Sequence, residues 1–260
     1  MRAPVMPDLS TTHLVLLVLA ALGAGVVDAI AGGGGLVTVP ALLTAGLPPQ
    51  LALGTNKGQS VFGATAALFR FARAGFVDPA RAKVAFPCGL AGSLVGAFAL
   101  TLLSPALLKP VVLGLLVAVA LFVGLRTGPP RVEARVPPRL VGLATAVIAL
   151  VIGAYDGFFG PGTGTFLIVA FASLLGDSLR RASGEAKVVN FASNLAAVTL
   201  FATRGLVVWK VALPMAAAQA LGGSIGAHLA IKQGDLLVRR VVLLVVLALV
   251  VKLGRDLIMG

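Results

Sequence analysis

The sequence predicts an all-α, polytopic membrane protein, and three observations lead to this fold class. Of the 260 residues, 58% are hydrophobic and 12% are charged, whereas soluble domains carry roughly 25% charged residues. Several uncharged stretches approach the roughly 20 residues that cross a bilayer as a helix. Glycine-rich motifs, which break helices, interrupt these stretches, and the motifs of the first half return in the second half. We therefore expect about 8–10 transmembrane segments.

The apolar stretches are separated by short connections, and two of them, 36–47 and 164–176, are too short for comfortable crossings. If both cross, each half has five spans, the halves are inverted and both termini lie outside. If both re-enter, the halves are not inverted, and the distribution of Lys and Arg barely separates the two topologies. We favour inverted repeats, because broken helices that meet at mid-membrane commonly line transport sites. The stretches are 12–31, 36–47, 54–75, 82–103, 106–125, 139–155, 164–176, 186–205, 209–231 and 236–253.

The net charge of +12 does not indicate nucleic-acid binding, because Lys and Arg fall mostly in short connections, as the positive-inside rule predicts. The single cysteine, Cys88, excludes an intramolecular disulfide. With no Cys/His cluster we expect no metal site and no cofactor. The N-terminal apolar run from Leu14 to Leu22 resembles a signal peptide, but it continues into a motif that recurs later and is interpreted as a retained first helix.

The chain divides into a first membrane repeat (1–127), a Pro/Arg-rich linker (128–138) and a second membrane repeat (139–260). We call the separation along the chain between Lys57 and Lys187 the lysine offset, and that between Asp28 and Asp156 the aspartate offset. The two offsets are nearly equal, and the small difference fits one short insertion. Lysines within apolar stretches do not match by chance as easily as small residues do. The ordered recurrence of both residue types therefore indicates an internal duplication.

Ionisable residues within hydrocarbon cost several kcal/mol, so each one is a functional hypothesis. Asp28 and Asp156 precede the glycine motifs, while Lys57 and Lys187 lie near the start of the following long stretch. The two aspartates could accept protons and couple transport to the proton gradient, or they could balance the lysine charges. A purely structural ion pair or helix cap is the alternative.

The glycine motifs offer backbone donors to an anion, because an interrupted helix leaves N–H groups unpaired at the next N-terminus. Tight packing of small residues is the alternative, and it accounts well for Gly92, Gly96, Gly222 and Gly226. The predicted anion-binding residues of the two motifs are Gly32, Gly33, Gly34 and Gly35 in the first half and Gly160, Gly162, Thr163, Gly164 and Thr165 in the second.

A polar helix start follows each glycine motif. In the second half, Lys187, Asn190 and Asn194 are spaced i, i+3 and i+7, so they share one helix face. The first half offers a smaller set, and interhelical hydrogen bonding is the alternative role for the amides. The candidate binding residues of the first half are Asn56, Lys57, Gln59 and Ser60.

Four segments together, GVVDAIAGGGG, LPPQLALGTNK, GAYDGFFGPGTG and AKVVNFASN, resemble the TauE/SafE sulfite-exporter family, and the likeness covers nearly the whole chain. The resemblance implies a duplicated secondary transporter for sulfite, sulfonates or another sulfur-containing organic anion. It also implies a multi-pass protein of the cytoplasmic (inner) cell membrane. The residues alone would not indicate sulfur chemistry.

The functional hypothesis is alternating access, with the anion held between the halves near the membrane midplane. The sequence contains no P-loop, so we expect a gradient to supply the energy. An anion channel or a non-transport membrane scaffold remains an alternative, and an enzyme is not expected. The expected partners are a small anionic substrate and the lipid bilayer, with no nucleic acid and with a homo-oligomer left open.

Overall fold

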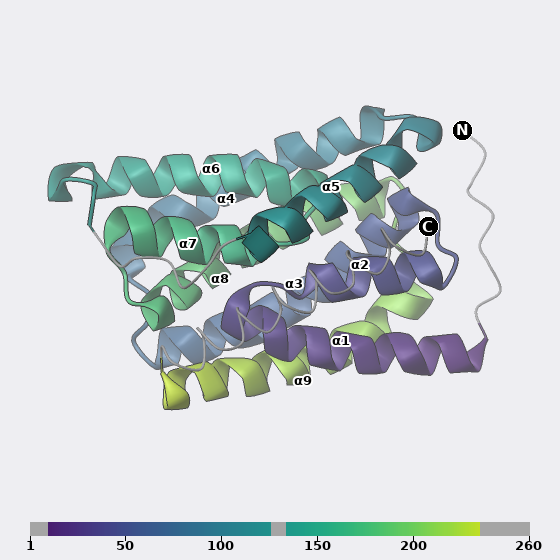
Figure 1. Cartoon of the computed structure of the whole chain (residues 1–260), viewed down its shortest axis with the longest axis horizontal. Coiled ribbons are helices and arrows are strands. Elements are labelled where there is room, and N and C mark those ends of the chain that lie inside the picture. The colour runs from purple at the N-terminus through teal and green to yellow at the C-terminus, as the bar shows by residue number, and fades with distance from the viewer. Residues whose placement is uncertain (1–9, 126–133, 235–260) are drawn as a thin grey trace.

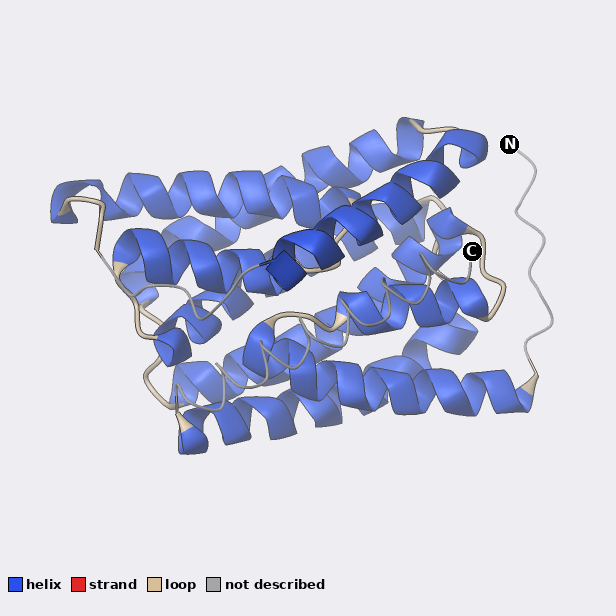
Figure 2. Ribbon diagram, in the orientation of Figure 1, coloured by secondary structure: helices blue, strands red, loops and turns tan. Residues whose placement is uncertain are grey.

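A computed structural model describes residues 10–125 and 134–234, so the predicted stretch 236–253 and most of the linker lie outside the described residues. Within those two ranges the regular elements are all helices (Figures 1 and 2). Their bounds agree with the predicted stretches to within a few residues at most ends. The helices are α1 (Thr11–Ala31), α2 (Gly35–Thr44), α3 (Pro49–Arg73), α4 (Pro79–Leu102), α5 (Pro105–Leu125), the 3₁₀ helix η1 (Pro138–Leu140), α6 (Val141–Phe158), α7 (Thr163–Leu175), α8 (Leu179–Thr203) and α9 (Trp209–Gln233).

Local sequence signals set several of these boundaries. The side chains of Ser10, Asp78 and Ser178 accept hydrogen bonds from backbone N–H groups in the first turns of α1, α4 and α8, as N-cap residues do. Pro79 occupies the first turn of α4, where its missing N–H removes no intrahelical bond. Gly32 ends α1 with a φ of 76°, a conformation that glycine adopts without strain.

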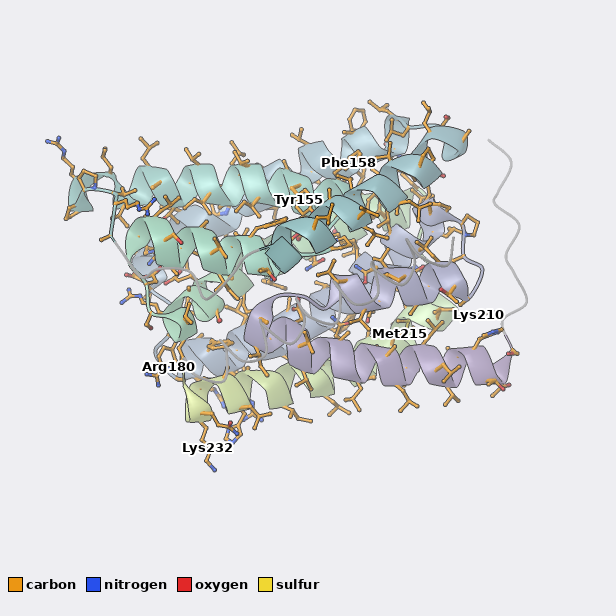
Figure 3. All side chains as sticks on the ribbon, in the orientation of Figure 1. Tyr155, Phe158, Arg180, Lys210, Met215 and Lys232 are labelled. Carbon is orange, nitrogen blue, oxygen red and sulfur yellow. The ribbon has the colours of Figure 1, made fainter. Side chains whose placement is uncertain are left out.

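Four helical segments are long and apolar enough to cross a membrane: α1, α4, α8 and the segment Pro138–Phe158, which contains α6. The helices α2 and α7 have 10 and 13 residues, as short as the sequence predicts. Arg180 and Lys232 lie at one end of the bundle and Lys210 at the other (Figure 3). The all-α, multi-pass membrane fold is therefore confirmed.

Long helices pack in pairs that each combine the two predicted halves. The helix α1 packs along α9, α4 packs along α6, and α3 and α8 contact each other between these pairs. In Figure 1, α4 and α6 lie along the upper edge and α1 and α9 along the lower edge. The halves are therefore interlocked rather than separate bodies.

Glycine makes the close approach within these pairs possible. A Cβ at Gly92 of α4 would lie 2.1 Å from the carbonyl oxygen of Leu150, and a Cβ at Gly222 of α9 would lie 2.1 Å from that of Leu22. Gly92 and Gly222 are separated by the lysine offset, and Leu22 and Leu150 by the aspartate offset. The same contact therefore recurs at the spacings found in the sequence. The packing role predicted for these glycines agrees with this geometry.

Both short helices turn back along the helix that precedes them. The backbone N–H of Arg135, before α6, donates to the carbonyl of Leu174 at the end of α7. Leu17 of α1 and Leu42 of α2 share one buried cluster. The chain enters α1 at the right of Figure 1 and α6 at the left. An inverted repeat predicts this arrangement, and the duplication and the placement of both hairpins in the bilayer stay predictions.

Replacing Gly222 with Ala should destabilise the protein by about 1–3 kcal/mol, because the added methyl overpacks against the α1 backbone. The matched control is Gly23→Ala in α1, where a Cβ would meet nothing within 4 Å. That change should be neutral or slightly stabilising, because alanine is the better helix former. Thermal unfolding in detergent compares the two variants, and equal melting temperatures would contradict the packing.

Candidate functional site

Two buried ion pairs connect the halves. Lys57 Nζ of α3 lies 2.7 Å from Asp156 Oδ1 of α6. Lys187 Nζ of α8 lies 2.7 Å from Asp28 Oδ2 of α1 and donates a second bond to the backbone carbonyl of Asp28. Both lysine side chains are almost completely buried. Each lysine therefore pairs with the aspartate of the other half, a partner that the sequence did not specify.

The glycine motifs bring the two aspartates together, because the turn after α1 touches the start of α7 and the turn after α6 touches the start of α2. A Cβ at Gly32 would lie 2.1 Å from the carbonyl carbon of Gly164. Gly160 and Gly162 have φ values of 96° and 84°, which side-chain-bearing residues rarely adopt. We call the turns at 32–34 and 160–162 the two hairpin tips. The contact between Gly32 of the first tip and Gly164 at the start of α7 requires glycine on both sides.

Neighbouring donors fix the aspartate carboxylates. Thr163 Oγ1 donates to Asp156 Oδ1 at 2.9 Å, and the backbone N–H of Gly34 donates to Asp28 Oδ1 at 3.3 Å. Both donors belong to the predicted glycine motifs. The Gly34 N–H and the Thr163 hydroxyl therefore each hold the aspartate of their own hairpin, while a lysine reaches that aspartate from the other half.

The orientation of Asn56 follows from its hydrogen bonds. Thr38 Oγ1 lies 2.6 Å from Asn56 Oδ1, and Gln59 Nε2 lies 3.0 Å from the same oxygen. Because both donors engage the amide oxygen, the –NH₂ group remains for other partners. Asn56 therefore presents a donor where it lines the cavity between the tips.

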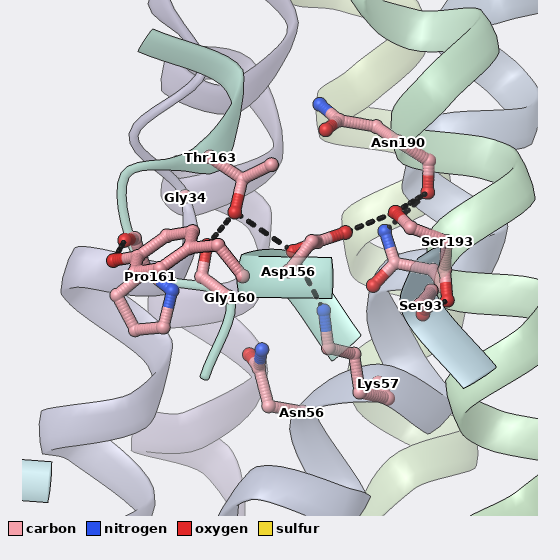
Figure 4. A network of polar contacts seen from close by, with 12 residues as sticks. Gly34, Asn56, Lys57, Ser93, Asp156, Gly160, Pro161, Thr163, Asn190 and Ser193 are labelled. Atoms are coloured by element: carbon pink, nitrogen blue, oxygen red, sulfur yellow. Dashed lines mark hydrogen bonds and ion pairs between the residues drawn. The ribbon is translucent and has the colours of Figure 1, made fainter. Parts of the chain in front are cut away.

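A small polar cavity lies between the hairpin tips, α3 and α8, and Figure 4 shows much of its wall. Its water-accessible volume is about 20 Å³, close to the roughly 10–15 Å³ that one water needs. Every lining residue was predicted from the sequence as a binding or charge-bearing residue. The lining residues are Asp28, Gly32, Gly35, Asn56, Lys57, Ser60, Asp156, Gly160, Thr163, Gly164, Asn190 and Asn194.

The remaining predicted residues lie behind the cavity wall or beside it. Lys187 holds Asp28, and Gln59 holds Asn56. Thr165 Oγ1 donates to the carbonyl of Ala31 at 2.8 Å, which ties the start of α7 to the end of α1. The other residues of this set are Gly33, Gly34 and Gly162, which belong to the tips without lining the cavity.

Among the described residues, no group of three or more His, Cys, Asp or Glu side chains could hold a metal ion. The cavity is lined by three amides, two hydroxyl groups, glycine backbone, both paired aspartates and one of the paired lysines. The amides, hydroxyls and lysine can donate hydrogen bonds, and the aspartates can accept them.

Comparison with known proteins identifies the family. The profile described as "Sulfite exporter TauE/SafE" matches residues 17–253. The chain belongs to the TauE/SafE family. The resemblance noted in the sequence is thereby confirmed.

Three curated relatives align with this chain over nearly the whole length of both proteins. A probable membrane transporter protein, ORF9, of Sinorhizobium sp is 39% identical over 96% of both chains. A probable membrane transporter protein of Haemophilus influenzae is 36% identical over 96% of this chain and 97% of the relative. The probable membrane transporter protein YfcA of Escherichia coli K12 is 36% identical over 94% of this chain and 90% of the relative. No solved structure matches. Family and relatives together support a membrane transporter.

Sequence reasoning missed Ser193 in this TauE/SafE protein. Its hydroxyl makes a short hydrogen bond to Asp156 Oδ2, and Ser93 Oγ donates to the carbonyl of Ser193 at 2.6 Å. Ser193 follows Asn190 by three residues and shares its helix face, so helical periodicity could have found it.

The two pairs of the TauE/SafE site are not equivalent. Asp156 receives bonds from Lys57, Thr163 and Ser193 and its side chain is 4% exposed, whereas the side chain of Asp28 is 19% exposed. The described partners of the Asp28 carboxylate are Lys187 and the N–H of Gly34. The pair of Asp28 and Lys187 is therefore the less constrained one.

A double-mutant cycle tests the pair of Lys57 and Asp156. Lys57→Met leaves a buried carboxylate without its cation and should cost about 3–5 kcal/mol. Adding Asp156→Asn removes that charge, so the double variant should be more stable than Lys57→Met alone. Thermal unfolding in detergent measures the cycle, and strictly additive losses would show that the two side chains do not interact.

Proposed function

We propose that the protein is a secondary transporter of small anions, with sulfite, a sulfonate or another sulfur-containing organic anion as the substrate class. The observation that carries the proposal is the polar cavity between the two hairpin tips, which the crossed ion pairs flank. The family description supports sulfur chemistry, and the printed names of the relatives support transport. The cytoplasmic (inner) membrane is part of the same proposal.

Hydrogen-bond donors would hold the anion. The tips provide backbone N–H groups at helix starts, where anions bind readily. Asn56 adds an amide donor, and Asn190 and Asn194 of α8 line the cavity on the opposite helix. The oxygens of a sulfite or sulfonate accept hydrogen bonds as a carboxylate does, so the substrate could take the place of an aspartate beside a lysine.

The charges of the two ion pairs support a charge-balancing role for Asp28 and Asp156 rather than proton acceptance. Each carboxylate has an oxygen 2.7 Å from a lysine nitrogen, so the four charges cancel. We propose that both aspartates balance the lysines, and that the pair of Asp28 and Lys187 opens to admit the anion because fewer bonds restrain it.

The size of the cavity supports alternating access. A sulfite or sulfonate group is larger than the one or two waters that about 20 Å³ accommodates. Binding therefore requires the tips to separate. We propose that one half rocks against the other around this cavity, as in other transporters with broken helices.

Counterflow in proteoliposomes tests the proposal with labelled sulfite, thiosulfate, methanesulfonate, sulfate and acetate. We expect saturable counterflow of at least one sulfur oxyanion and a loss of about tenfold or more in Lys187→Gln and Asn190→Leu, because both remove donors from the site. Lys210→Gln, on an exposed residue in the first turn of α9, is the matched control and should transport like the parent.

Two outcomes would contradict this function. Anion conductance without counterflow would indicate a channel. Equal counterflow in the parent, Lys187→Gln and Asn190→Leu would remove the proposed site.

A further inference from the structure

A partly buried charged cluster lies away from the central cavity, where the connection before α4 meets the start of α8. Arg81 Nη1 donates to both carboxylate oxygens of Asp177, at 2.9 and 2.8 Å. Arg181 bridges Asp78, at 3.0 Å, and Asp177, at 3.5 Å. Glu185 Oε1 accepts a 2.8 Å bond from the backbone N–H of Asp78. We call these five residues the charged end.

The backbone contact that supports the charged end recurs at the opposite end of the bundle. A Cβ at Gly184 would lie 2.4 Å from the carbonyl oxygen of Phe76, and a Cβ at Gly54 would lie 2.1 Å from that of Leu206. The lysine offset separates Gly54 from Gly184 and also Phe76 from Leu206. Each end therefore packs an interhelical connection against the start of a long helix in the same way.

The side chains at the two ends differ completely. The positions that the lysine offset relates to the charged end form an apolar end, in which four residues belong to one buried hydrophobic cluster. Thr55 is the exception and takes the place of Glu185. The residues of the apolar end are Leu47, Leu51, Thr55, Val208 and Val211.

Thr55 shows that the bond to the connection does not require a carboxyl group. Its Oγ1 accepts a 3.0 Å bond from the backbone N–H of Val208, the counterpart of the bond between Asp78 N–H and Glu185 Oε1. A hydroxyl is therefore sufficient for this contact. The second oxygen of Glu185 needs a separate explanation.

That second oxygen is poorly satisfied. Glu185 is 0% exposed, and its Oε2 has no hydrogen-bond partner among the described residues. The charged side chains that face it are Arg81, Asp177 and Arg181, but Arg81 directs Nη1 to Asp177 and leaves its Nε and Nη2 without described partners. Arg180 stacks on Phe76 in the same connection. A buried ionised oxygen without a donor is unfavourable, whereas the neutral acid keeps the bond to Asp78.

We propose that Glu185 is a proton-binding site that controls opening at the charged end. Protonation stabilises the closed contact between α8 and the connection before α4, and loss of the proton weakens it. Arg70, Arg73 and Lys83 flank the same connection, so the positive-inside rule assigns this end to the cytoplasmic side. The apolar end offers no titratable counterpart, so the pH response should come from one side only. That this contact closes a transport pathway rests on the proposed function.

Hydrogen–deuterium exchange in nanodiscs tests the site without requiring transport. Glu185→Gln keeps an acceptor for the Asp78 N–H and mimics the protonated acid. Near pH 5, the amides of residues 76–81 should exchange at the same rate in the parent and in Glu185→Gln. Near pH 8, where a carboxylate is ionised, they should exchange about tenfold faster in the parent than in the variant. Comparing the two at the same pH cancels the intrinsic pH dependence of exchange. A parent-to-variant ratio that is constant between these pH values would overturn the proposal.

Thr55→Val is the matched control, because it removes the equivalent bond at the apolar end. Exchange at residues 206–210 should rise in this variant by a factor that does not change with pH. In proteoliposomes, parent counterflow of methanesulfonate or sulfate should slow as pH falls on the charged side alone, and Glu185→Gln should lose that dependence. If exchange behaves as expected but the parent shows no counterflow, the proposed transport function is wrong and the proton site stands. If counterflow is normal but the parent-to-variant exchange ratio is the same at both pH values, the proton site is wrong and the transport function stands.

Discussion

The crossed pairing of two lysines with two aspartates is the constraint on which the rest of the structure depends. A buried ion pair is weak as a source of net stability, but a buried charge without its partner is costly. Lys57 needs α6 beside α3, and Lys187 needs α1 beside α8. Each pair takes its lysine from one half and its aspartate from the other, so neither half can form either pair alone. The interlocked packing and the central polar site therefore have the same physical origin.

Glycine allows this arrangement to close. The contact between Gly32 and Gly164 lets two chain breaks meet without side chains between them, and the same breaks leave backbone N–H groups at the following helix starts. Thr165 then ties the start of α7 to the carbonyl of Ala31. The turns that assemble the fold are therefore also the turns that carry the donors proposed to bind an anion.

The sequence predicts the helices well because hydropathy, prolines and glycine breaks are local signals. It also singles out Asp28, Asp156 and Lys57, which line one cavity, because an ionisable position that recurs in two apolar stretches has few roles. It does not predict which lysine meets which aspartate, since the spacing along a chain does not specify neighbouring helices. The sequence also does not predict the role proposed for Glu185. That role depends on the comparison with Thr55, which makes the equivalent bond at the other end of the bundle.

An anion bound between the hairpin tips is the central claim, and selenium anomalous diffraction on crystals soaked with selenite or selenate, heavy analogues of sulfite and sulfate, tests it most directly. The account predicts that the tips separate around the anion, with a selenium peak within hydrogen-bond range of the side-chain nitrogens of Asn56, Lys57 and Asn190, and loss of this peak in Lys187→Gln. Peaks only outside the cavity, or an unchanged peak in that variant, would contradict it.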